Sequence, residues 1–83
     1  MIFLAITPVG LPEALRTAKP GDHVWCGSDA VSEAGCKALP PPKPSRFTYS
    51  LTDLDAADCI KGAVATTEEH HPGHAVWVER RPA

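Results

Sequence analysis

The chain has 83 residues, of which 43% are hydrophobic and 22% charged, and its formal net charge is −2. A domain of this size buries about 60–65% of its surface, so its stability would be modest and self-association would add to it. The slightly acidic balance argues against a nucleic-acid partner, and no stretch reaches the ~20 apolar residues of a membrane span.

The first predicted element is an apolar strand in residues 1–10, which carry no charge and end in a Thr-Pro-x-Gly turn. A strand that is apolar on both faces must be covered on both, so it should be the central strand of a small sheet flanked by helices. Pro12 and Glu13 then suit the first turn of a short helix, which should stop at Lys19-Pro20-Gly21.

A second strand is predicted in residues 22–27, and Ser28 or Asp29 can cap a short helix after it. The proline-rich segment 39–45 should be a stiff connector, although its P-x-x-P spacing also suits recognition by SH3-type domains. Polar and apolar residues alternate in 46–51, which predicts a half-buried strand with Phe47, Tyr49 and Leu51 inward. The longest helix should run from Thr52 to about Glu69.

A last strand in residues 74–79 completes the order β-α-β-α-β-α-β. This alternation predicts one three-layer α/β domain over residues 1–83, with four mostly parallel strands. We expect a Rossmann-like sheet of order 2-1-3-4, a truncated flavodoxin-like arrangement. The alternative is an α+β ferredoxin-like fold, which requires that residues 28–39 contain no helix.

Ligands of open parallel sheets bind at the carboxyl ends of the strands. Hydroxyls, glycines and helix amino termini gathered there could hold a small anion such as a phosphate. The same residue types are also those that helix caps and turns require, so both interpretations stay open. The residues predicted to converge are Thr7, Gly10, Ser28, Asp29, Ser50 and Asp53.

Three histidines, His70, His71 and His74, lie close together in the sequence before the last strand and could bind zinc or a similar ion. The alternative is a solvated helix end, where histidines suit the negative pole of the helix dipole. Cys26 could be a reactive thiol, but His23 should lie on the opposite face of the strand, which favours a buried structural cysteine.

The three cysteines, with no recognisable secretory signal, predict reduced thiols and a cytoplasmic location. No catalytic residue and no cofactor are assigned. The leading hypothesis is a non-enzymatic interaction or accessory module that binds a protein partner or itself, with Trp77 as a contact residue. The alternatives are a small anion- or nucleotide-type ligand-binding or enzyme domain and a metal-binding accessory protein; neither nucleic acid nor membrane is expected.

Overall fold

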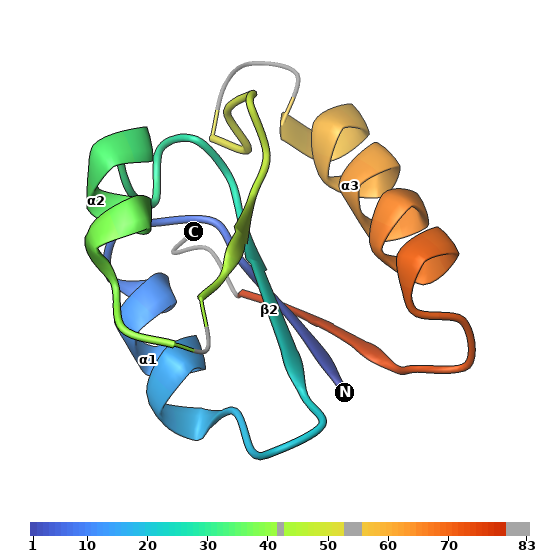
Figure 1. Ribbon diagram of the computed structural model, residues 1–83. Helices are drawn as coiled ribbons and strands as arrows, with labels where there is room; N and C mark the ends of the chain where they lie inside the picture. The colour runs from blue at the N-terminus through green and yellow to red at the C-terminus, as the bar shows by residue number, and fades with distance from the viewer. Residues whose placement is uncertain (42, 53–55, 80–83) are drawn as a thin grey trace.

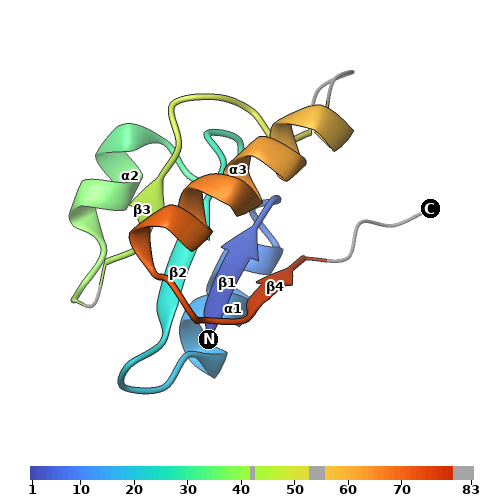
Figure 2. The same cartoon turned by 90° about the vertical axis from the view of Figure 1, so that its right-hand side faces the viewer.

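The computed structural model describes residues 1–41, 43–52 and 56–79 of the chain (Figure 1). Its centre is a four-stranded parallel sheet of order β3-β2-β1-β4, and Figure 2 shows the four labelled strands in this order. All three strand pairings are parallel. The strands are β1 (Ile2–Ala5), β2 (His23–Cys26), β3 (Ser45–Arg46) and β4 (Val76–Val78).

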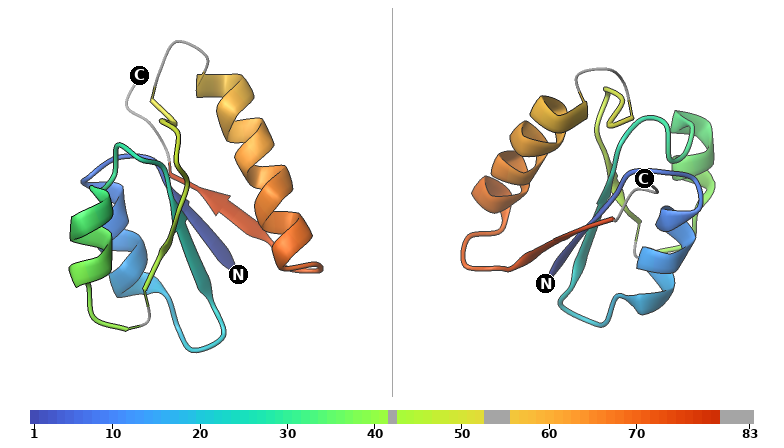
Figure 3. Two further views of the ribbon diagram at one scale, coloured as in Figure 1. Left: turned by 45° about the horizontal axis from the view of Figure 1, so that its top comes forward. Right: turned by 180° about the vertical axis from the view of Figure 1, so that it is seen from behind.

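Helices cover the sheet on both sides, which confirms the predicted three-layer α/β arrangement. Helices α1 (Gly10–Thr17) and α2 (Glu33–Ala38) lie on one side, and α3 (Ala56–His70) lies on the other (Figure 3). The chain moves outward from β1 to β2 to β3 and then crosses back to β4. Because crossovers between parallel strands are right-handed, this reversal carries α3 to the opposite face.

The core has two halves separated by β1, whose four residues are all buried. Successive side chains of a strand point to opposite faces. Phe3 and Ala5 therefore pack with Leu11 and Ala14 of α1, while Leu4 and Ile6 form the second half under α3. The remaining buried members of that second half are Phe47, Leu51 and Ala63. The prediction that the first strand is central and covered on both faces is confirmed.

The predicted strand order 2-1-3-4 is wrong in the place of β3. This strand pairs with β2 at one edge of the sheet, and β1 has β4 as its second neighbour. Helix α2 has six residues, so the chain returns directly beside β2, whereas the fifteen-residue α3 spans the sheet to reach the far side of β1. Only Ser45 and Arg46 pair as β3. Phe47 and Leu51 are buried as predicted, but Tyr49 stays 39% exposed.

Two helix starts also differ from the expectation. The cap of α2 is Ser32, whose Oγ accepts a hydrogen bond from Gly35 N at 3.0 Å, and neither Ser28 nor Asp29 takes that role. The predicted start of the long helix at Thr52 falls next to residues 53–55, which lie outside the described part of the chain. No described helix has the length and apolar character needed to cross a membrane.

Candidate functional site

The crevice of an open parallel sheet lies where neighbouring connections leave in opposite directions, which here is between β1 and β4. The side chain of Glu79, directly after β4, fills the turn that follows β1. Its Oε1 accepts hydrogen bonds from the backbone N–H groups of Ile6 at 2.7 Å and Thr7 at 2.8 Å. Its Oε2 accepts from Thr7 Oγ1 at 2.5 Å, and Gly10 N donates to the same hydroxyl at 3.2 Å.

Gly10 leaves the space that the Glu79 carboxylate occupies. A Cβ at position 10 would lie 1.9 Å from Glu79 Oε1, so any other residue there would displace the carboxylate from its hydrogen bonds. Thr7 and Gly10, predicted as anion-binding residues, thus do surround an anionic group, but the group is a carboxylate of the same chain. The sequence argument missed Glu79, whose only signal is an acidic residue at the end of the last strand.

The other predicted anion-binding residues form a separate cluster at the end of β2. Asp29 Oδ2 accepts hydrogen bonds from the hydroxyls of Ser50 and Thr52, and Ser28 N donates to Tyr49 O at 3.0 Å. The hydroxyls of Ser50 and Thr52 lower the pKa of Asp29. These contacts fasten the turn after β2 to the loop after β3. Asp53, the sixth predicted residue, lies outside the described residues.

The histidines gather at the opposite, amino-terminal end of the strands. His71 stacks on His23, with ring centroids 3.7 Å apart and planes at 13°, and His74 lies edge-on to His23 at 5.6 Å. His70 instead packs near Trp25 at 5.3 Å. The partial burial of His71 and the neighbouring imidazoles lower its pKa. Within residues 1–41, 43–52 and 56–79, no three His, Cys, Asp or Glu side chains are arranged to hold a metal ion.

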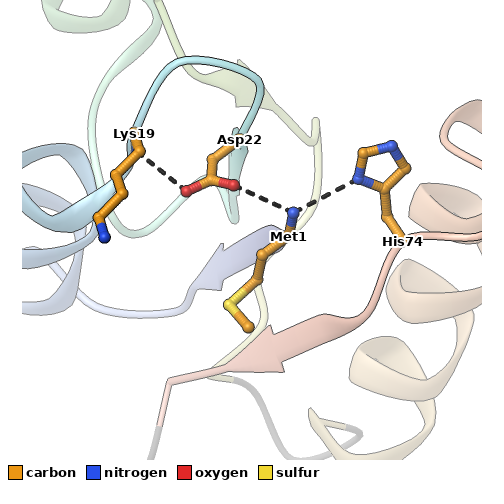
Figure 4. Close-up of polar contacts among 4 residues, drawn as sticks. All are labelled: Met1, Lys19, Asp22 and His74. Carbon is orange, nitrogen blue, oxygen red and sulfur yellow. Dashed lines mark hydrogen bonds and ion pairs between the residues drawn. The ribbon is translucent and has the colours of Figure 1, made fainter.

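An ionic clasp closes the same end of the sheet (Figure 4). Asp22 Oδ1 accepts from the Met1 amino group at 3.0 Å, and its Oδ2 accepts from Lys19 N at 2.9 Å. The Met1 amino group also lies 3.4 Å from His74 Nδ1. The Lys19 amide and the Met1 amino group lower the pKa of Asp22. The clasp ties the start of β1 to the loops that lead into β2 and β4.

Cys26 does not have the environment of a reactive thiol. It is fully buried against α1, and that burial raises its pKa to about 11. The protonated thiol is a weak nucleophile. Cys26 belongs to the core half under α1, whereas His23 stacks with His71. The geometry therefore supports the structural interpretation of Cys26.

A groove lies between α1 and β4, on the face of the sheet that α1 covers and toward the β4 edge. It encloses about 460 Å³, and its wall includes the ring of Trp77, which is 47% exposed. Phe3 meets this ring edge-on, with centroids 5.8 Å apart. The groove is lined by Met1, Phe3, Glu13, Ala14, Thr17 and Trp77, and we call it the Trp77 groove.

Comparison with known proteins does not identify a relative. No protein-family model, no curated protein and no solved structure matches this chain. The geometry of the described residues therefore carries the argument about function. Among its features, the Trp77 groove combines an exposed aromatic side chain with an unpaired strand edge.

Proposed function

We propose that this protein is a non-enzymatic interaction module that binds an extended polypeptide segment along the outer edge of β4. The observation that carries the proposal is Trp77, which stays 47% exposed on an edge strand while it lines the groove beside α1. Tryptophan side chains are over-represented among residues that dominate binding energy at interfaces. Of the four large hydrophobic side chains exposed among the described residues, Met1 and Trp77 both line this groove.

The backbone of β4 supports the addition of a strand. On its inner side, Ala75 O accepts from Ile2 N at 2.8 Å and Glu79 N donates to Leu4 O at 2.9 Å. Alternate residues of a strand point their backbone groups to opposite sides, so Val76 and Val78 point theirs outward. No strand in the described part of the chain pairs with them. An extended peptide could satisfy these groups by β-augmentation.

The strand order supports the same edge. The order 3-2-1-4 is that of the first four strands of the Rossmann sheet, in which a fifth strand pairs with the outer edge of the fourth. Here a partner would supply that strand. The anion-binding alternative is less well supported, because the Glu79 carboxylate already takes the donors of Ile6 and Thr7.

The expected affinity follows from the area available. Covering the exposed half of a tryptophan, on the order of 100 Å², contributes roughly 2.5 kcal/mol. Association costs about 4–15 kcal/mol in lost translational and rotational freedom. Main-chain hydrogen bonds and contacts in the groove must offset the part of this cost that the tryptophan does not. We therefore expect roughly micromolar binding, typical of a transient interaction.

The test is a selection of peptides from a random library on the folded protein, with removal of those that also bind Val76→Pro. Val76 is the first residue of β4 and its N–H points outward, so proline there removes an outer donor and spares the inner ladder. The selected peptides should alternate apolar and polar residues and should lose at least tenfold in affinity for Trp77→Ser. Val9→Ser is the matched control, because Val9 is 78% exposed and outside the groove. Peptides that bind Trp77→Ser and Val9→Ser equally well would contradict the proposal.

A further inference from the structure

We infer that the strand added to β4 is β4 of a second copy of this chain, placed antiparallel by a two-fold axis through Trp77. This inference rests on the proposed function, because it names the partner that fills the same edge. A symmetric interface pairs one surface with its own copy. The edge must therefore be complementary to itself, and three features of the described residues meet that requirement.

The first feature is the register of the backbone groups. With the axis at Trp77, Val76 lies opposite the partner's Val78, and Val78 lies opposite the partner's Val76. All of these residues turn their N–H and C=O groups outward, and each such pair exchanges two hydrogen bonds. An axis at Val76 or at Val78 would leave one of the two outward residues of β4 without a partner inside the strand. The axis at Trp77 is the one that uses both.

The second feature is the position of the aromatic ring. Trp77 would face the partner's Trp77 as a non-hydrogen-bonded pair, in which Cα atoms are about 4.5 Å apart and side chains approach most closely. A two-fold axis perpendicular to the sheet keeps α1 of both copies on the same face. The two Trp77 grooves then adjoin across the axis, and each exposed ring covers the other above Phe3.

The third feature is charge. β4 consists of Val76, Trp77 and Val78 and carries no charged side chain. Glu79 would lie across from the partner's Ala75, and its carboxylate is held by Ile6 and Thr7 within its own chain. Glu13 on the groove wall is paired with Arg16, with 2.6 Å between Oε1 and Nη2. Among the described residues of β4 and the groove wall, no like charges therefore face each other in this register.

The area available sets the strength of the dimer. Two half-exposed tryptophans bury on the order of 200 Å² together, and the strands and groove walls must supply most of the ~1,200 Å² that a stable interface needs. The pairing thus falls at the small end of specific interfaces. We expect a dimer that forms at micromolar concentration and separates on dilution, with a continuous sheet of eight strands.

Cysteine cross-linking under mild oxidation tests the register. The background is the full chain with Cys36→Ser and Cys59→Ala, because these two native thiols are partly exposed. Trp77→Cys alone should form a disulfide-linked dimer, since Cα atoms about 4.5 Å apart lie within the bonding range of about 4.4–6.8 Å. It should form more slowly than the mixed pair below, because the variant lacks the indole ring and leaves fewer dimers for the disulfide to trap. Val76→Cys alone and Val78→Cys alone should not, because their copies would be about 8 Å apart or more. An equal mixture of Val76→Cys and Val78→Cys should cross-link.

The outcome separates this inference from the proposed function. Sedimentation equilibrium of the native chain should show a monomer–dimer equilibrium that Trp77→Ser shifts at least tenfold toward monomer, while Val9→Ser leaves it unchanged. Cross-linking of Val76→Cys alone, or a strictly monomeric chain at millimolar concentration, would overturn the inference. If selected peptides still bound β4 in that case, the proposed function would stand with a different partner.

Discussion

The two edges of the sheet are built differently. β3 has two residues and follows Pro44, which has no N–H to offer. The side chain of Arg46 turns back and donates to Val31 O at 2.7 Å and to Ser28 O at 3.3 Å. β4 instead presents three uncharged residues and an exposed Trp77.

Among the described residues, β3 carries more of the devices that prevent strand addition than β4 does. Short strands, prolines and charged side chains are the usual means by which proteins protect a sheet edge. β3 combines all three, and its neighbour Cys36 places its Sγ 3.6 Å from Pro44 O. Within residues 76–78, β4 has only its shortness as protection. In the described part of the chain, β4 is therefore the less protected edge of the sheet, and this is the physical reason for proposing that the interaction occurs there.

The largest expected effect comes from releasing the end of β4. Gly10→Ala places a Cβ against Glu79 Oε1 and should expel the carboxylate, so we expect the free energy of unfolding in urea to fall by about 2–3 kcal/mol. Alanine otherwise favours a helix start over glycine, which makes the sign of this result informative.

Glu79→Ala and the double variant are the controls for this prediction. Glu79→Ala should itself be destabilising, because it leaves Ile6 N and Thr7 N without their acceptor. In the double variant the clash is absent, so Gly10→Ala should cost much less than it does alone. Strictly additive effects would show that the carboxylate and Gly10 are not coupled.

The next effect separates binding from stability at β4. Trp77→Ser should weaken association tenfold or more, because the exposed half of the ring is the main apolar contact at the edge. Its free energy of unfolding should also fall, by about 2 kcal/mol, because the buried half of the ring, which meets Phe3 edge-on, is lost within the monomer. Sedimentation and urea unfolding on the same samples measure the two effects. A large loss of stability with unchanged association would reverse the assignment.

A smaller effect is expected at the protected edge. Arg46→Ala removes two hydrogen bonds to the carbonyls of Val31 and Ser28, which should lower the unfolding free energy by about 1 kcal/mol. It also uncovers β3, so the variant should aggregate faster than the native chain in light-scattering assays. Arg46→Lys keeps the charge without the planar group and is the matched control. Equal aggregation of all three proteins would mean that Arg46 does not protect this edge.

The smallest effect concerns pH at the turn that leads into β4. His71 has a pKa below its ordinary value of 6.5, with partial burial as the first cause and His23, His74 and His70 as the others. A proton therefore binds His71 more readily in the unfolded chain than in the folded one. The stability that neutral His71 contributes is complete above pH 6.5 and is lost as pH falls through the lowered pKa.

Thermal unfolding between pH 8 and pH 5.5 measures this dependence. His71→Gln, which cannot be protonated, should lose less of its melting temperature than the native chain over that interval. Asp22 also faces this region, but its pKa is lowered from 3.8, so its own contribution is lost only at more acidic pH. Identical pH profiles of the two proteins would show that the stacked pair of His23 and His71 does not sense pH.

The sequence alone predicted the features that depend on local pattern. The uncharged run of β1 required cover on both faces, and Phe3 and Leu4 do face opposite core halves. Strand-like segments alternate along the sequence with segments of helical periodicity. This alternation predicted the parallel α/β sheet, because consecutive parallel strands need a crossover connection. Trp77 on the last strand was predicted as a contact residue, and its exposure agrees with that hypothesis without testing it.

Only the tertiary structure decided which strands are neighbours and which side chains meet. The place of β4 beside β1 depends on how far α2 and α3 carry the chain, and no local pattern encodes that distance. The contact of Glu79 with Thr7 joins residues 72 positions apart, and His23 at the start of β2 likewise stacks on His71, which follows α3. Local sequence pattern thus specified the type of most elements, whereas long-range packing determined which strands lie at the two edges of the described sheet.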